Sequence, residues 1–218
     1  AQNDQRIASD KISKLTYKIE NLKSGVISEN DARIFPGLYA PLIVMRNGER
    51  VIEPFRYQLR PAGESPAFDR KFNGTYNARR DRLQEVFWWK SLMGKSHGLL
   101  PISAFYENVK RHDLEHRTLR TGETEENLIL KFVPESLDEM LVPCIFDQNR
   151  AEPFVLNSFA LITDEPNPEV AAAGHDRTPI ILKDENFERW LTPGLPFSEY
   201  DGVLGDKKST YFEHSIAA

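Results

Sequence analysis

The dipeptide Asn47-Gly48 constrains the fold of this chain more than any other local feature, because it lies between two apolar runs. Residues 42–45 predict one strand, and residues 51–59 predict a second strand that returns beside the first. Both central positions of a type I′ turn need a positive φ, which Asn and Gly adopt easily. The sequence therefore predicts an antiparallel hairpin over this segment.

Apolar runs of strand length continue through the second half of the chain. Four more strands are predicted at 99–109, 127–133, 141–146 and 154–163. Helical spacing of apolar residues predicts helices at 9–24, 82–93 and 184–191, the first with Ser9 as its N-cap. The tail after Pro193 is polar and Gly-rich, and it either wraps the domain or frays.

The chain has 218 residues, a length that suits one domain with its own core. We expect a single α+β domain over residues 1–218, in which peripheral helices surround a predominantly antiparallel, barrel-like β-sheet.

Cysteine content and charge narrow the possible functions. Cys144 is the one cysteine, so no internal disulfide and no site with several cysteine ligands can form. The net charge of −5 argues against a uniformly basic nucleic-acid-binding surface. No apolar run reaches the roughly 20 residues of a membrane helix, and the polar first residues do not resemble a signal peptide. We expect a cytoplasmic monomer that uses no metal, cofactor or membrane.

A basic segment at residues 69–82 is the exception to the acidic balance. It holds five basic residues against two acidic ones. Such a segment can hold a phosphate backbone by ion pairing and counterion release. The alternative is a mixed charged run that faces water.

Three polar side chains stand in settings that suit chemistry. Asn77 precedes a predicted helix, where its amide either caps the helix or positions a substrate. Glu107 ends an apolar run between aromatic residues, and it is either a desolvated acid–base group or an edge-strand charge that faces water. His175 lies in a loop before an apolar run, and it is either a functional imidazole or ordinary polar surface. Each residue alone is ambiguous, and their order along the chain carries the interpretation.

The order of several short motifs resembles that of the SRAP (SOS response-associated peptidase) family. The motifs that carry the resemblance are Asn77-Ala78-Arg79, Phe105-Tyr106-Glu107, Leu161-Ile162-Thr163 and His175-Asp176-Arg177-Thr178-Pro179. The Trp190-Leu191 pair and the dipeptides Asn47-Gly48 and Arg56-Tyr57 are also similar to family elements. The motif-bearing core then covers about residues 33–192, and a polar tail covers about residues 193–218.

The resemblance implies a protein of the bacterial cytoplasm that binds abasic sites in single-stranded DNA. Family members remove their initiator Met and expose an N-terminal cysteine, whose α-amine and thiol form a thiazolidine cross-link with the ring-opened sugar. Three catalytic roles carry over: Asn77 orients the cysteine, Glu107 is the general acid/base, and His175 assists ring opening and cross-link reversal. The resemblance also implies DNA contacts, to phosphates by Arg79, Thr163 and Arg177, and to the lesion pocket by Pro36. The family's Asn-Ala-Arg-x-Glu is here Asn-Ala-Arg-Arg-Asp, and we expect the basic residue Arg80 to add a DNA contact.

The start of the chain departs most from the family, since no cysteine lies near Ala1. Cys144 lies in a predicted strand and has no α-amine, so it cannot replace the missing nucleophile. Some family members begin Met-Cys-aromatic-Ser-Ala-Gln, and this chain begins Ala1-Gln2, so we expect a cysteine just upstream. Two alternatives stay open: a non-catalytic homologue that binds single-stranded DNA, and a small-molecule hydrolase that uses the same Asn, Glu and His.

Overall fold

The computed structural model describes residues 2–25, 33–136, 139–150 and 155–217 of the 218-residue chain. The chain forms two compact units, Ala1–Phe35 and Pro36–Ala218. The first unit contains helix α1 (Gln2–Lys23), which confirms the helix predicted at 9–24. This helix begins earlier than predicted because no Gly or Pro precedes Ser9, so Ser9 lies inside the helix and is not its N-cap. The single domain predicted for the whole chain stays a prediction.

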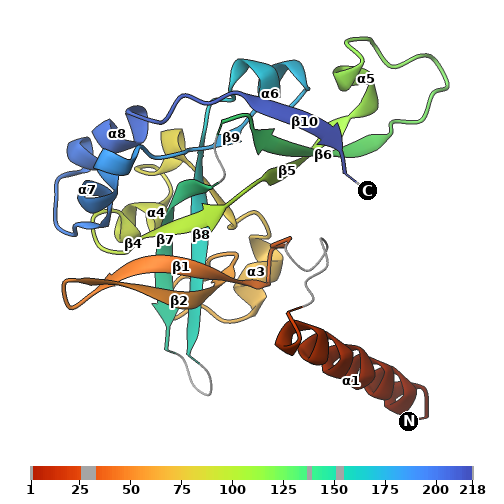
Figure 1. Cartoon of the computed structure of the whole chain (residues 1–218), viewed down its shortest axis with the longest axis horizontal. Coiled ribbons are helices and arrows are strands. Elements are labelled where there is room, and N and C mark those ends of the chain that lie inside the picture. The colour runs from red at the N-terminus through yellow and green to blue at the C-terminus, as the bar shows by residue number, and fades with distance from the viewer. Residues whose placement is uncertain (1, 26–32, 137–138, 151–154, 218) are drawn as a thin grey trace. The chain divides into compact units, whose positions relative to one another are not determined.

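In the second unit, five strands close into a barrel (Figure 1). The strands are β1 (Tyr39–Arg46), β2 (Glu49–Tyr57), β4 (His97–Ile102), β7 (Met140–Asn149) and β8 (Leu156–Asp164). They lie in the order β2-β1-β4-β7-β8, and a parallel pairing of β2 with β8 joins the two ends. The other four pairs are antiparallel, which confirms the predicted barrel-like sheet.

The β1–β2 hairpin forms where Asn47-Gly48 predicts it. Asn47 has a φ of 53° and Gly48 a φ of 83°, the positive values of a type I′ turn. Buried and exposed residues alternate along the first half of β1, and Leu42 and Val44 have no exposed surface. The turn and the burial pattern therefore specify one register.

A short strand, β3 (Asn77–Arg79), pairs with β8 just beyond the residues of β8 that pair with β2. Tyr57 of β2 lies opposite Phe159, and β3 pairs with the same strand from Leu161 onward. The end of β2 and the start of β3 are therefore neighbours along one edge, which places Tyr57 beside Asn77. Strand β9 (Thr178–Pro179) pairs with the far end of β8 and anchors the loop that precedes it.

A separate antiparallel sheet has three strands in the order β10-β6-β5. Its strands are β5 (Phe105–Lys110), β6 (Asn127–Pro134) and β10 (Phe212–Ile216). One face of this sheet is apolar, and there the rings of Phe105 and Phe132 stack with centroids 5.0 Å apart.

Short helices pack against both sheets. They are α3 (Ala67–Lys71), η1 (Arg80–Arg82), α4 (Phe87–Leu92), α5 (Arg111–Leu114), α6 (Pro168–Ala172), η2 (Asp184–Asn186), α7 (Phe187–Leu191) and α8 (Phe197–Gly205). Trp190 of α7 is fully buried, and its indole N–H donates to the carbonyl of Gly98 at 2.9 Å. Its ring stacks on His97 with centroids 4.1 Å apart. Burial lowers the pKa of His97 to about 4, so this imidazole is neutral and belongs to the core.

Several elements differ from the prediction for identifiable reasons. The strand predicted at 99–109 is two strands, β4 and β5, because the chain crosses from the barrel to the second sheet between them. The helix predicted at 82–93 is interrupted, because Val86 has extended backbone angles, with φ −79° and ψ 119°. Asn77 lies in a strand, so its alternative role as a helix cap is wrong. The tail after Pro193 forms α8 and β10 and wraps the second unit.

Candidate functional site

Glu107 and His175 are in direct contact. Glu107 lies on β5, and His175 follows helix α6 after a turn at Gly174, whose φ is 95°. The carboxylate Oε2 of Glu107 lies 3.1 Å from the imidazole Nε2 of His175. The two side chains are only 18% and 20% exposed, respectively, so the pair is largely shielded from water yet open to a ligand.

The surroundings of the pair favour sharing of one proton. Nδ1 of His175 lies 2.9 Å from the carbonyl oxygen of Arg177 and 3.4 Å from its backbone nitrogen, and the shorter contact favours a hydrogen on Nδ1, because a carbonyl can only accept. In neutral imidazole, Nε2 is then an acceptor that faces Glu107. Burial raises the pKa of Glu107 to about 7; the positive charge of protonated His175 opposes this rise, and the charge of Asp176 adds to it. Near neutral pH, Glu107 can therefore both give and take a proton.

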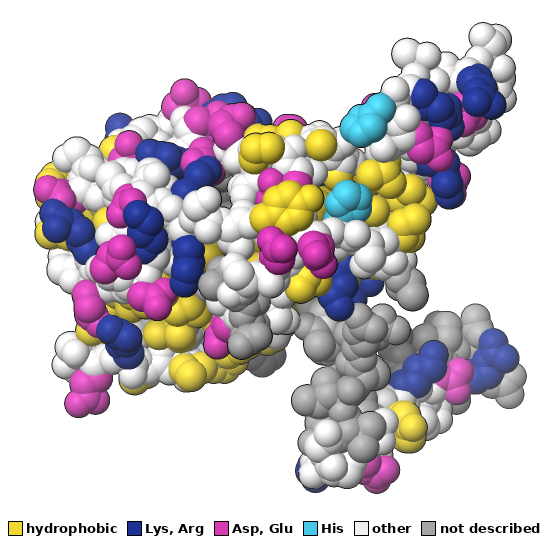
Figure 2. Space-filling model, turned by 45° about the horizontal axis from the view of Figure 1, so that its top comes forward, with side chains coloured by type: hydrophobic (Ala, Val, Ile, Leu, Met, Phe, Trp, Pro, Cys, Tyr) yellow, Lys and Arg dark blue, Asp and Glu magenta, His cyan; other side chains and the backbone are white. Residues whose placement is uncertain are grey.

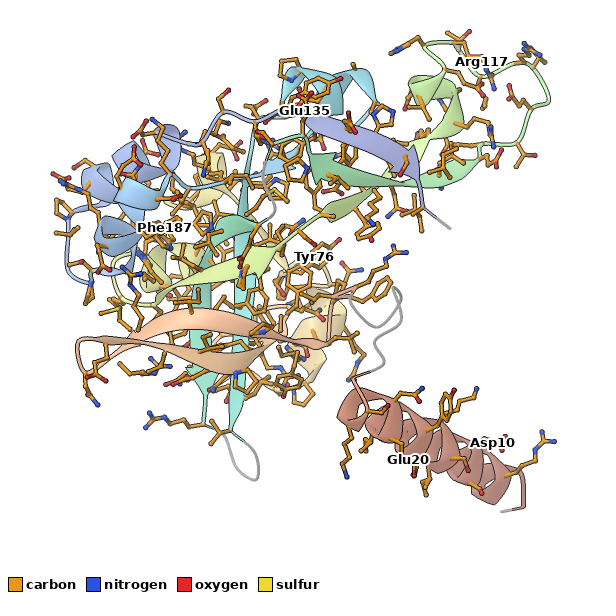
Figure 3. The ribbon with its side chains drawn as sticks, viewed as in Figure 1. Asp10, Glu20, Tyr76, Arg117, Glu135 and Phe187 are labelled. Atoms are coloured by element: carbon orange, nitrogen blue, oxygen red, sulfur yellow. The ribbon has the colours of Figure 1, made fainter. Side chains whose placement is uncertain are left out.

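Asn77 is held by a tyrosine that sequence reasoning missed. The hydroxyl of Tyr57 donates to the Oδ1 of Asn77 at 2.8 Å, which leaves the amide NH₂ as the group that can donate to a ligand. Tyr76, labelled in Figure 3, packs edge-on against Tyr57 with centroids 5.7 Å apart. Burial raises the pKa of Tyr57 well above its ordinary value, and the charge of Glu107 raises it further. Tyr57 therefore contacts Asn77 directly and lies close enough to Glu107 to be affected by its charge.

Pro36 lies at the same end of the barrel. The next residue, Gly37, donates its N–H to the carbonyl of Tyr57 at 2.6 Å, and the N–H of Tyr57 donates to Leu38 at 2.8 Å. Pro36 itself is exposed. Its position beside the Tyr57 backbone is compatible with the predicted place at the rim of a lesion pocket.

Two of the predicted phosphate contacts lie near the same carboxylate, one exposed and one with its side chain only 13% exposed: Arg79 and Arg177, respectively. Arg79 is exposed and pairs with both carboxylate oxygens of Asp81, at 3.1 and 2.9 Å. Arg177 pairs with Glu165 at 3.0 Å and approaches the same Asp81 at 3.9 Å. These arginines flank the His175 loop, and a bound phosphate has to compete with the two carboxylates for them.

The other two predicted phosphate contacts do not fit their surroundings. The guanidinium of Arg80 bonds to Asp201 at 2.9 Å and to Asp164 at 3.2 Å, so it ties the end of β8 to α8. Thr163 is 1% exposed, which leaves no room for a phosphate at its hydroxyl. The sequence alone does not reveal these contacts, because the acidic partners of Arg80 and the residues that bury Thr163 come from distant parts of the chain.

The basic segment at 69–82 is not a continuous basic surface. Its paired arginines are matched by acids, including Arg82 with Glu85 and Arg79 with Asp81. On the face drawn in Figure 2, Lys and Arg side chains are interspersed with Asp and Glu side chains. The mixed charged run is therefore the better description of this segment.

The described part of the chain contains no group of three or more His, Cys, Asp or Glu residues arranged to bind a metal ion. None of its helices combines the length and the apolar character needed to cross a membrane. A hollow of about 470 Å³ adjoins the His175 loop, and its wall contains Asp113, His116 and Gly174 but not the Asn77, Glu107 and His175 side chains. It does not provide the enclosed pocket that the hydrolase alternative predicts around those three.

The raised pKa of Glu107 predicts a pH-dependent stability. The unfolded carboxyl ionises near its ordinary value of 4.5, whereas the folded carboxyl keeps its proton to about pH 7. As the pH rises from the unfolded pKa to the folded pKa of Glu107, the free energy of unfolding of the wild type therefore falls, by up to about 3 kcal/mol. Glu107→Gln removes the titration, so urea unfolding is expected to show a variant that is more stable than wild type at about pH 8 and equally stable at about pH 4.5. A difference of the same size at both pH values contradicts this prediction.

Comparisons with known proteins identify the family and the fold. The sequence profile of the family described as SOS response associated peptidase (SRAP) matches residues 5–212. The abasic site processing protein YobE of Bacillus subtilis (strain 168) is 30% identical over 117 residues, which are 54% of this chain and 48% of YobE, so the match spans about half of that relative. A crystal structure from Bacteroides thetaiotaomicron has a TM-score of 0.65 at 17% identity and covers 85% of this chain and 76% of its own. One from Bordetella bronchiseptica has a TM-score of 0.63 at 20% identity and covers 84% of this chain and 86% of its own. At these identities the two structures show a shared fold.

Proposed function

Because this chain belongs to the SOS response-associated peptidase (SRAP) family, we propose that it processes abasic sites in single-stranded DNA. The observation that carries the proposal is the 3.1 Å contact between Glu107 and His175, next to a tyrosine that holds Asn77. The name of the relative YobE, an abasic site processing protein, supports the same substrate class.

The proposed first step opens the sugar ring of the abasic site. The bond between C1 and the ring oxygen breaks, the ring oxygen takes up a proton, and the C1 hydroxyl gives one up to leave an aldehyde. Glu107 and His175 share one proton across a short contact, so one group can donate while the other accepts. A Glu107 pKa of about 7 matches this exchange to neutral pH.

The proposed second step captures the aldehyde on a cysteine that carries a free α-amine, placed ahead of Ala1 after removal of an initiator Met. The amine adds to the aldehyde carbon and water leaves, which gives an imine. The thiol then adds across the C=N bond: sulfur bonds to carbon, its proton goes to nitrogen, and a thiazolidine forms without oxidation or reduction. Cys144 does not serve, because it is fully buried, its thiol pKa is raised by burial, and it has no α-amine.

The remaining residues position the strand and the nucleophile. The NH₂ group of Asn77 orients the cysteine, while the Tyr57 hydroxyl fixes the other end of that amide. Arg79 and Arg177 hold the phosphates on either side of the lesion. Those phosphates replace the carboxylates of Asp81 and Glu165 as partners of the two guanidinium groups. Pro36 lines the lesion pocket.

Abasic single-stranded DNA tests the proposal directly. A form that carries Cys-Tyr-Ser ahead of Ala1 is expected to give a DNA adduct that survives a denaturing gel, because it supplies both amine and thiol. The chain that begins at Ala1 is expected to bind the abasic strand in a salt-sensitive manner without an adduct. Binding without an adduct in both forms favours a non-catalytic binding protein. Absence of any preference for the abasic strand over an intact strand contradicts the proposal.

A further inference from the structure

Helix α5 connects the two segments that carry Glu107 and His175. It begins at Arg111, directly after β5, the strand that carries Glu107 (Figure 1). Asp113 of this helix lies against Gly174, the residue before His175. One short helix therefore joins the strand of the carboxylate to the turn of the imidazole, and the facing atoms of these two groups lie 3.1 Å apart.

Gly174 leaves no room for a side chain where it meets α5. A Cβ atom on Gly174 would lie 2.9 Å from the Cβ of Asp113, well inside the distance of about 3.5–4.0 Å at which carbon atoms pack. It would also lie 3.6 Å from the backbone carbonyl carbon of Asp113 and 3.7 Å from the backbone nitrogen of Leu114. The φ of 95° at Gly174 is one that glycine adopts at little cost. This turn and this close approach of two backbone segments both require glycine.

Both sides of the contact are held by hydrogen bonds. On the side of α5, the backbone N–H of Arg111 donates to the carbonyl of Glu126 at 2.8 Å. On the other side, the backbone N–H of His175 donates to the carbonyl of Val170 at 3.2 Å, and Val170 is fully buried. Because both segments are anchored, a displacement at Gly174 is passed to the next residue, His175.

We propose that Gly174 and Asp113 are positioning residues, whose close contact holds the imidazole of His175 against the carboxylate of Glu107. The inference rests on the proposed function for its effect on the reaction, but the geometry that it describes can be measured without DNA. If the contact were ordinary loop packing, its substitution would lower stability and leave the Glu107–His175 pair as it is.

The first test measures the pair itself, by the nuclear Overhauser effect between the ring protons of His175 and the side-chain protons of Glu107 without DNA. Gly174→Ala adds the Cβ that meets Asp113, so this variant is expected to lose the signal. Gly122→Ala is the matched control, because Gly122 also has a positive φ, 80°, and follows α5 in the same connector, but a Cβ there meets no atom within 4 Å. It is expected to keep the signal, although both variants place alanine at a positive φ.

The second test measures the rate of adduct formation at saturating abasic DNA, in the form that begins with a cysteine. Gly174→Ala is expected to slow the reaction about 10- to 100-fold, because a displacement of about 1 Å at a reacting group costs a factor of that size. The affinity of the chain that begins at Ala1 for the abasic strand is expected to stay within about twofold. Gly122→Ala is expected to react at the wild-type rate. A purely structural role would lower the Tm of both variants and leave both rates unchanged.

Asp113→Gly tests the same contact from the side of α5, and it remains informative if Gly174→Ala does not fold. It removes the Cβ that lies against Gly174, and it is expected to slow adduct formation about 3- to 10-fold. When Gly174→Ala is added to this variant, the rate is expected to change by less than about threefold, since the two Cβ atoms no longer meet.

Four results overturn the inference. They are an intact His175–Glu107 signal in Gly174→Ala, loss of that signal in Gly122→Ala, a wild-type rate for Asp113→Gly, and a full further loss of rate in the double variant. A form that begins with a cysteine but gives no adduct overturns the proposed function instead. In that case the signal measured without DNA still decides whether Gly174 and Asp113 position the pair.

Discussion

Replacing Glu107 with Gln slows formation of the DNA adduct by about 100-fold or more in the form that begins with a cysteine. The amide keeps the size of the side chain and its contact with the His175 imidazole, 3.1 Å away in the wild type, but it has no proton to exchange near neutral pH. Ring opening then lacks its acid–base group. The measurement is the initial rate of adduct formation on an abasic strand, read from denaturing gels at several pH values.

Glu213→Gln is the matched control for this loss. Glu213 lies on β10 opposite Val133, and Glu107 lies on β5 opposite Leu130, so the two carboxylates stand on opposite faces of one sheet. The control is expected to react at the wild-type rate, and both variants are expected to bind the abasic strand within about twofold of wild type. A Glu107→Gln rate within about threefold of wild type contradicts the acid–base role.

Trp190→Ala lowers the free energy of unfolding by about 3–5 kcal/mol. The substitution removes a fully buried ring that stacks on His97 and donates a hydrogen bond to Gly98. The resulting cavity lies between α7 and β4, where neutral His97 cannot reach water for compensation. Urea unfolding followed by circular dichroism measures the loss without depending on the fluorescence of the removed residue.

Phe87→Ala provides the comparison for an exposed aromatic residue. Phe87 is 80% exposed at the start of α4, and its truncation is expected to change stability by less than about 0.5 kcal/mol. A loss below about 1 kcal/mol for Trp190→Ala contradicts the contribution assigned to its buried ring.

Local signals predicted the parts of the fold that local chemistry decides. Asn47-Gly48 specified the hairpin because positive φ values at two adjacent positions leave few other turns. The apolar runs at 42–45 and 127–133 predicted strands β1 and β6, because their length suits a strand better than a helix. The run at 99–109 was misjudged because apolar spacing continues across the passage from one sheet to the other, where only the partner strands change.

The candidate site was predictable where motifs carry it and not where tertiary contacts do. The resemblance assigned Glu107 and His175 to one site, and the structure places their side chains 3.1 Å apart. Tyr57 was missed as a site residue because its hydrogen bond to Asn77 depends on the pairing of β2 with β8, which no local sequence pattern predicts. Arg80 was misjudged for the same reason, since Asp164 and Asp201 reach it from distant segments. A basic residue next to a motif therefore says little about phosphate binding until its acidic neighbours are known.

The pairing of Tyr57 with Phe159 also sets the point in synthesis at which strand β2 gains its second neighbour. About 100 residues separate these partners, and ribosomes add about 5–20 residues per second. The outer edge of β2 therefore stays unpaired for many seconds during translation, until β8 is made and pairs with it. A fragment that is released before β8 is made therefore lacks His175 and keeps an uncovered strand edge, which can pair with other nascent chains.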